Sequence, residues 1–74
     1  MTDALAKLPI LTTVALLCDL DASGLARGQV GTVVEELDEV TALVEFSDDE
    51  GRAYSVAACP WSALLALKTS PLAA

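Results

Sequence analysis

Apolar and polar residues alternate with a period of two along much of the chain, and clusters of Gly, Asp and Ser interrupt this alternation at short intervals. Such alternation is typical of β-strands that bury one face, and the interruptions are typical of turns. The Ala/Leu-rich residues 2–8 are also compatible with a helix, but the expected fold class is all-β. The pattern predicts five short strands, over residues 12–20, 30–37, 41–47, 52–57 and 65–68.

The segments between the strands carry the residues that turns require. Residues 21–24 end the first strand, and a loop continues to Gly28. Asp38-Glu39 is a plausible two-residue hairpin turn, and Gly51 closes an acidic turn where a positive φ suits glycine. Pro60 stands where a helical turn begins, which predicts one 3₁₀ or α turn before the last strand. This order of elements is the plan of a small SH3-like barrel of about five short strands.

The hairpin at residues 30–47 determines which side chains face the core. Its turn, if it sets the register, predicts three cross-strand pairs: Glu36–Thr41, Val34–Leu43 and Thr32–Glu45. Most packing residues then share the opposite face: Gly31, Val33, Glu35, Ala42, Val44 and Phe46. On that face, Glu35 is expected near the barrel mouth, in reach of water. Gly31 is expected to let the opposing backbone or Phe46 approach closely.

Length and composition agree with one small domain. The 74 residues are 54% hydrophobic, which is enough to form a core. We assign residues 11–68 to the barrel, residues 1–10 to an N-terminal extension and residues 69–74 to a C-terminal tail. The apolar run at residues 8–18 is too short to span a bilayer and lacks the positively charged flank of a signal peptide. A cytoplasmic location is therefore expected.

The charge of the chain is concentrated in one segment. Eleven acidic and four basic residues give a net charge of −7, and there is no histidine. Residues 35–50 hold eight acids and no base, whereas the rest of the chain carries +1. The lack of histidine excludes His-based catalysis and His-ligated metals, and the scarcity of bases argues against a grip on nucleic-acid phosphates. The acidic segment is either a solvated surface or a binding surface.

The remaining motifs give little support to a chemical site. The carboxylates lie in or beside turns, where they are solvated, and residues 48–50 lack the spacing of an EF-hand. A strand follows residues 28–31, whereas a phosphate loop would precede a helix. Cys18 and Cys59 form no C-x-x-C pair, and two buried thiols are favoured over a disulfide. We expect a protein that is not an enzyme and has no cofactor or bound metal.

A partner-binding surface is the candidate site that remains. The predicted register exposes Val34 beside Leu43 on the outer face, between the carboxylates of Glu36 and Glu45. Trp61, on the helical turn, either adds an aromatic anchor to this patch or covers the end of the barrel. The candidate partner-binding residues are Val34, Glu36, Asp38, Glu39, Leu43, Glu45, Asp48, Asp49, Glu50 and Trp61.

Short motifs along residues 12–67 follow one another in a familiar order. They are Thr13-Val14-Ala15-Leu16-Leu17, Asp19-Leu20, Gly24-Leu25-x-Arg27-Gly28-x-Val30-Gly31-Thr32-Val33-Val34-Glu35, Val44-Glu45-Phe46, the acidic turn ending in Gly51, and a closing leucine segment after Trp61. With these motifs, the chain resembles a bacterial domain-of-unknown-function family of short, free-standing SH3-like proteins. It is more loosely similar to the SH3-like barrel of the nitrile hydratase beta subunit and its small activators, through Arg27-Gly28-x-x-Gly31, Val44-x-Phe46 and Tyr54-x-Val56. The resemblance implies the fold and carries over no activity.

We expect a module that binds another protein and does not catalyse a reaction. Its size and negative charge suit neutralisation of a basic enzyme, as in antitoxin or immunity proteins, because opposite charges steer association. The nitrile hydratase similarity suggests an accessory subunit or maturation factor as the alternative. A homodimer that buries Val34, Leu43 and Trp61 is also compatible with the pattern. No membrane partner is expected, and a nucleic-acid-binding KOW-type barrel would need a basic face, which four scattered bases hardly provide.

Overall fold

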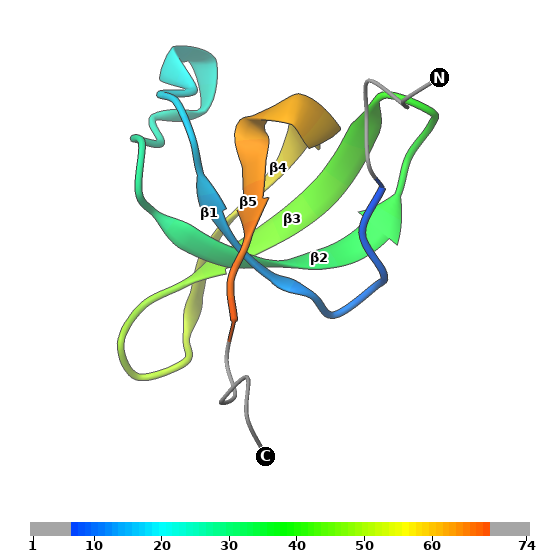
Figure 1. Ribbon diagram of the computed structural model, residues 1–74. Helices are drawn as coiled ribbons and strands as arrows, with labels where there is room; N and C mark the ends of the chain where they lie inside the picture. Colours follow the sequence, from blue (N-terminus) through cyan, green and yellow to red (C-terminus); the bar gives the residue numbers. More distant parts are fainter. Residues whose placement is uncertain (1–6, 69–74) are drawn as a thin grey trace.

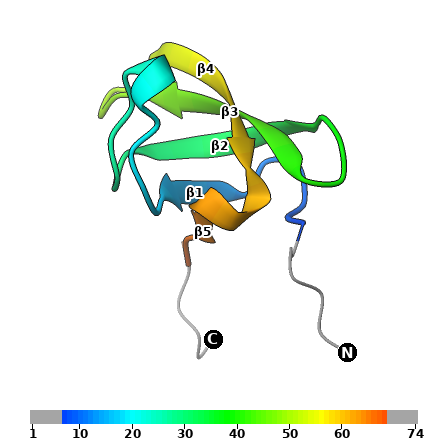
Figure 2. The same ribbon diagram turned by 90° about the horizontal axis from the view of Figure 1, so that it is seen from above.

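Five antiparallel strands form one curled sheet in the computed structural model, which describes residues 7–68 (Figure 1). The elements in chain order are β1 (Thr13–Leu16), η1 (Asp21–Ser23), β2 (Val30–Glu36), β3 (Thr41–Ser47), β4 (Ala53–Pro60), η2 (Trp61–Ala63) and β5 (Leu64–Ala66). The strands lie in the order β4-β3-β2-β1-β5. The 3₁₀ turn η2 leads from β4, at one edge, into β5 at the other (Figure 2). The predicted all-β SH3-like barrel, with a 3₁₀ turn before its last strand, is confirmed.

Strand ends differ from the prediction by one residue in several places and by more in β1, β4 and β5. β1 stops at Leu16, four residues early, because the chain turns there into a loop that brings Leu25 into the core. β4 continues to Pro60, which lies opposite Thr41. The N–H of the next residue, Trp61, donates to the carbonyl of Val40 at 3.0 Å. Because hydrogen-bonded and non-hydrogen-bonded pairs alternate, Pro60 occupies a position that needs no N–H. β5 is the short segment Leu64–Ala66.

Part of the segment predicted as an N-terminal extension lies against the barrel. Leu8 packs on the core, and the N–H of Leu11 donates to the carbonyl of Val33 at 2.6 Å. Leu11 has a φ of 77° and an exposed side chain. Residues 1–6 and 69–74 lie outside the described residues, so the assignment of an extension and a tail stays a prediction there.

A β-bulge in β2 corrects the predicted register of the first hairpin. The observed pairs are Gly31–Phe46, Thr32–Glu45, Val33–Val44, Glu35–Leu43 and Glu36–Ala42. The Thr32–Glu45 pair is as predicted, but Val34 has no partner, so the predicted pairs Val34–Leu43 and Glu36–Thr41 are wrong by one residue. Opposite residues share a face of the sheet. The bulge therefore places Glu35 on the outer face and Glu36 on the inner face, at the barrel mouth.

The inner face of β2, β3 and β4 builds the core in cross-strand rows. The rows are Gly31–Phe46–Ser55, Val33–Val44–Ala57 and Glu36–Ala42–Cys59. A Cβ at Gly31 would lie 2.7 Å from both the carbonyl oxygen of Glu45 and Cγ1 of Val44, and 3.0 Å from Cδ2 of Phe46. The close approach expected at Gly31 is confirmed. Buried side chains from the rest of the chain complete the core: Val14, Leu16, Leu25, Trp61 and Leu64.

Candidate interaction surface

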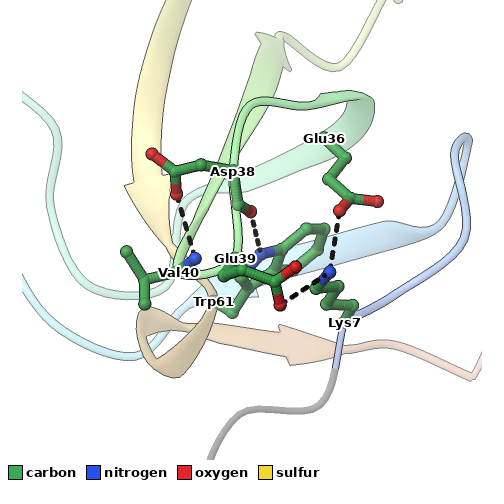
Figure 3. Close-up of polar contacts among 6 residues, drawn as sticks. All are labelled: Lys7, Glu36, Asp38, Glu39, Val40 and Trp61. Carbon is green, nitrogen blue, oxygen red and sulfur yellow. Dashed lines mark hydrogen bonds and ion pairs between the residues drawn. The ribbon is translucent and has the colours of Figure 1, made fainter.

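Lys7 folds back onto the acidic residues at the barrel mouth (Figure 3). Its Nζ lies 2.8 Å from Oε2 of Glu36 and 3.1 Å from Oε1 of Glu39. Hydrogen bonds to Glu36 and then to Glu39 raise the pKa of Lys7 above its usual 10.5. The bulge makes this contact feasible, because it places Glu36 at the mouth and away from the outer face. Two of the eight acids therefore have Lys7 as their counter-ion.

Arg52 occupies a similar position at the opposite end of the hairpin, in the turn between β3 and β4. Its guanidinium pairs with Glu50, and its Nε lies 3.8 Å from Oδ2 of Asp48. Oδ1 of Asp48 accepts the backbone N–H groups of Glu50 and Arg52, both at 2.9 Å. Gly51 has the positive φ, 82°, that the sequence predicts for this turn. Asp48 thus holds the turn together as well as carrying charge.

Trp61 covers the end of the barrel and is 3% exposed. Its indole Nε1 donates to the backbone carbonyl of Asp38 at 3.4 Å, and the carboxylate of Asp38 accepts the N–H of Val40 at 2.9 Å (Figure 3). These contacts support the interpretation of Trp61 as a lid. The alternative prediction, an exposed aromatic anchor at this position, is wrong. Asp38, like Asp48, stabilises a turn through its side chain.

Three acids of the hairpin have no ion pair or side-chain hydrogen bond among residues 7–68: Glu35, Glu45 and Asp49. Two of them share the outer face of β2, β3 and β4. The cross-strand rows on that face are Thr32–Glu45–Val56 and Glu35–Leu43–Ala58. Val56 is 54% exposed. We call Glu35, Leu43, Glu45 and Val56 the acidic face.

The two carboxylates of the acidic face repel each other. Glu35 lies opposite Leu43, and Glu45 follows two residues later on the same strand, so the two glutamates are diagonal neighbours. In a regular ladder the backbones of diagonal neighbours are about 7–8 Å apart, and two like charges at that distance in water would repel by about 0.5 kcal/mol. No base among residues 7–68 is ion-paired with either carboxylate to relieve this repulsion. A cation supplied by another molecule would relieve it.

The acidic face overlaps the predicted site without matching it. Leu43 and Glu45 lie together as expected, but Val34 is half-buried in the bulge. Glu35 and Val56 were not among the predicted site residues. A second bulge, between β3 and β4, shifts the register again at Tyr54. Each bulge moves the pairing by one residue. A regular alternation counted from the turns therefore does not predict the positions of Glu35 and Val56 on the acidic face.

The cysteines and the possible metal ligands among residues 7–68 do not form a chemical site beside the acidic face. Cys59 is buried and Cys18 is exposed, so the prediction of two buried thiols is wrong for Cys18; both are free. Burial, and then the nearby Cys18, raises the pKa of the Cys59 thiol. Within residues 7–68, carboxylates and thiols do not gather in groups of three that would hold a metal ion. The same part of the chain contains no helix with the length and apolarity needed to cross a membrane.

The comparison with protein families gives one match. A family model described as "Domain of unknown function (DUF4926)" matches residues 10–66. No curated protein and no solved structure matches the chain. The matched range includes all five strands and both hairpins, and therefore the whole acidic face.

Proposed function

Because the chain belongs to the DUF4926 family, whose description specifies no activity, we propose a function from its surface: a non-enzymatic module that binds a basic partner protein. The acidic face is the binding site, and neutralisation of a basic enzyme, as by an antitoxin or immunity protein, is the role. The resemblance to short bacterial SH3-like proteins and the two free thiols support a place in the bacterial cytoplasm.

The observation that carries the proposal is the division of the eight acids into two kinds. Five acids in or beside the turns have a partner: Glu36 and Glu39 bind Lys7, Asp48 and Glu50 bind Arg52, and Asp38 accepts a backbone N–H. Three have no such partner among residues 7–68: Asp49 in the turn between β3 and β4, and Glu35 and Glu45 on the acidic face. Glu35 and Glu45 lie beside the half-buried Leu43 and the exposed Val56. A surface that carries unpaired like charges beside apolar side chains suits a partner of opposite charge.

Charge on this face would act mainly on the rate of association. Electrostatic steering raises association rates about 10- to 1000-fold, and salt removes the effect. Leu43 and Val56 would supply the apolar contact that slows dissociation once the partner has docked. A basic partner should therefore bind fast at low salt, with a rate that falls steeply as salt is added.

The experiment compares two variants that change the net charge equally. In Glu35→Gln/Glu45→Gln, two carboxylates of the acidic face are neutralised. In the control, Asp19→Asn/Asp21→Asn, two are neutralised in the loop before β2. Oδ1 of Asp19 accepts the backbone N–H of Arg27. The amide oxygen of an asparagine at position 19 can accept the same hydrogen bond. The tagged full chain is used to capture partners from the source cell, and association of the purified partner is followed by stopped flow.

We expect the acidic-face variant to associate roughly tenfold more slowly at low salt, and the loop variant to behave like the wild type. Equal loss in both variants would mean that only net charge matters, and an acidic partner would refute the proposal. Inhibition of the captured enzyme indicates neutralisation, whereas activation indicates the accessory-subunit role.

A further inference from the structure

The outer edge of β4 presents backbone groups that no strand among residues 7–68 uses. Within this part of the chain β4 pairs only with β3, and it is the last strand of the sheet. The N–H of Trp61 bonds to the carbonyl of Val40, so the adjacent pair Thr41–Pro60 is not itself hydrogen-bonded. Hydrogen-bonded and non-hydrogen-bonded pairs alternate along the strands, so Leu43–Ala58 and Glu45–Val56 are non-hydrogen-bonded pairs as well. The N–H and C=O groups of Val56 and Ala58 therefore point away from β3. No hydrogen bond among residues 7–68 uses them.

This edge lacks the protection that proteins usually give to an open strand. Charged side chains commonly block such edges, yet residues 53–60 contain none. Protection is confined to the two ends, a bulge at Tyr54 and Pro60. The hydroxyl of Tyr54 also accepts a hydrogen bond from Nε2 of Gln29, 2.8 Å away, which ties the loop before β2 to the start of the strand. A regular stretch, residues 55–59, stays open between these ends.

Charges around the open edge indicate what would pair with it. The acidic turn at residues 48–50 precedes β4, and Glu45 lies beside Val56 in the middle. The turn at Asp38-Glu39 lies at the far end, where Thr41 is opposite Pro60. An antiparallel pair of two β4 strands would bring the first acidic turn of each copy toward the second acidic turn of the other. Repulsion between the acidic turns therefore opposes pairing of two copies through β4. An extended segment with Lys or Arg at each end would instead meet opposite charge at both ends of the strand.

We propose that β4 accepts an extended basic segment of the partner protein, which adds to the sheet as a sixth strand. The new strand bonds to the N–H and C=O groups of Val56 and Ala58 and places cationic side chains near the two acidic turns. This inference rests on the proposed function and specifies how the partner is held: through its backbone at the β4 edge, next to the acidic face.

The test uses a synthetic peptide, Lys-Thr-Val-Thr-Val-Thr-Lys, and the full chain. Amide hydrogen exchange is measured by NMR with and without saturating peptide. We expect the amides of Val56 and Ala58 to exchange at least about tenfold more slowly with peptide. Those of Ala57 and Cys59, which already bond to β3, should change little. A peptide of the same pattern with Glu at both ends is the charge control and should give no protection.

A pair of variants at one position separates backbone from side-chain effects. Ala58→Pro removes the outward N–H at an edge position that tolerates proline, whereas Ala58→Ser keeps it. We expect Ala58→Pro to weaken binding of the basic peptide at least about tenfold and Ala58→Ser to bind like the wild type. If Ala58→Pro does not fold, protection of the two amides in the wild type decides the question.

Three results would overturn strand addition. They are binding of the peptide without protection of Val56 and Ala58, no binding of the peptide, and protection of the same amides in a peptide-free dimer at high concentration. None of these depends on the carboxylate variants. A partner that is lost with Glu35→Gln/Glu45→Gln but leaves Val56 and Ala58 unprotected would refute the edge and leave the proposed function standing.

Discussion

One added methyl group at Gly31 tests the packing of the barrel directly. In Gly31→Ala the Cβ would lie 2.7 Å from the carbonyl oxygen of Glu45 and from Cγ1 of Val44, and 3.0 Å from Cδ2 of Phe46. Carbon atoms pack best at about 3.5–4.0 Å, so the neighbours must move by close to 1 Å. One neighbour is backbone and the other two belong to fully buried side chains, so none moves easily.

The expected loss of stability is large for a domain of this size. Overpacking a core by one methyl group costs about 1–3 kcal/mol, and replacing glycine returns about 0.4–1 kcal/mol through the unfolded chain. Because the clash has three sides, we expect a net loss of about 2 kcal/mol. At about 0.05–0.15 kcal/mol per residue, the whole domain is stable by about 4–11 kcal/mol.

The assay is urea denaturation followed by the fluorescence of Trp61, the single tryptophan, which is buried. With an m-value of about 1 kcal/mol/M, the midpoint should fall by about 2 M. Gly24→Ala is the control: Gly24 has a φ of 69° but open space around it, so only backbone strain of about 1 kcal/mol applies. Gly31→Ala at least as stable as this control would refute the steric argument.

Three further predictions follow from buried or paired side chains. Trp61→Ala should lower the free energy of unfolding by about 3–5 kcal/mol, measured by urea denaturation followed by circular dichroism, because the buried indole is lost. Cys18 should react with a thiol reagent in the native state and Cys59 only in urea, since burial shields Cys59 and raises its pKa; a native reaction of both thiols would contradict this. The contacts with Glu36 and Glu39 that raise the pKa of Lys7 stabilise the folded state below pH 10.5. This stabilisation is lost as the pH rises through the pKa that Lys7 has in the folded protein. Thermal melts of the wild type and Lys7→Gln should therefore differ at neutral pH and converge above pH 10.5.

Alternation and turn residues were sufficient to predict the elements of the fold. The Asp48–Gly51 turn and the 3₁₀ turn after Pro60 occur where the sequence places them. These features depend on local backbone preferences, which neighbouring residues determine. Gly31 is a longer-range success: a glycine inside a β-rich segment indicates a close neighbour, and Glu45 and Val44 provide it.

The surface was harder to predict because it depends on the bulges. Val34 and Tyr54 have ordinary strand-forming side chains, so nothing local marks either as the extra residue. Lys7 and Arg52 lie outside the acidic segment in the sequence, one before it and one after it, yet both form ion pairs with its carboxylates. A count of charges along the chain does not show these ion pairs. The sequence thus located the acidic hairpin but did not indicate which of its acids form ion pairs.

The order of the strands has a consequence for how the chain reaches its native state. Glu36 and Ala42 pair across a separation of 6 residues, whereas Leu16 and Leu64 pair across 48. Closing the longer loop costs about 2 kcal/mol more chain entropy. The meander of β2, β3 and β4 should therefore form early in folding, and the docking of β5 on β1 should limit the rate. Until β5 docks, the half-formed sheet is open along β1 as well as β4, so slow closure is the step at which this chain is most exposed to aggregation.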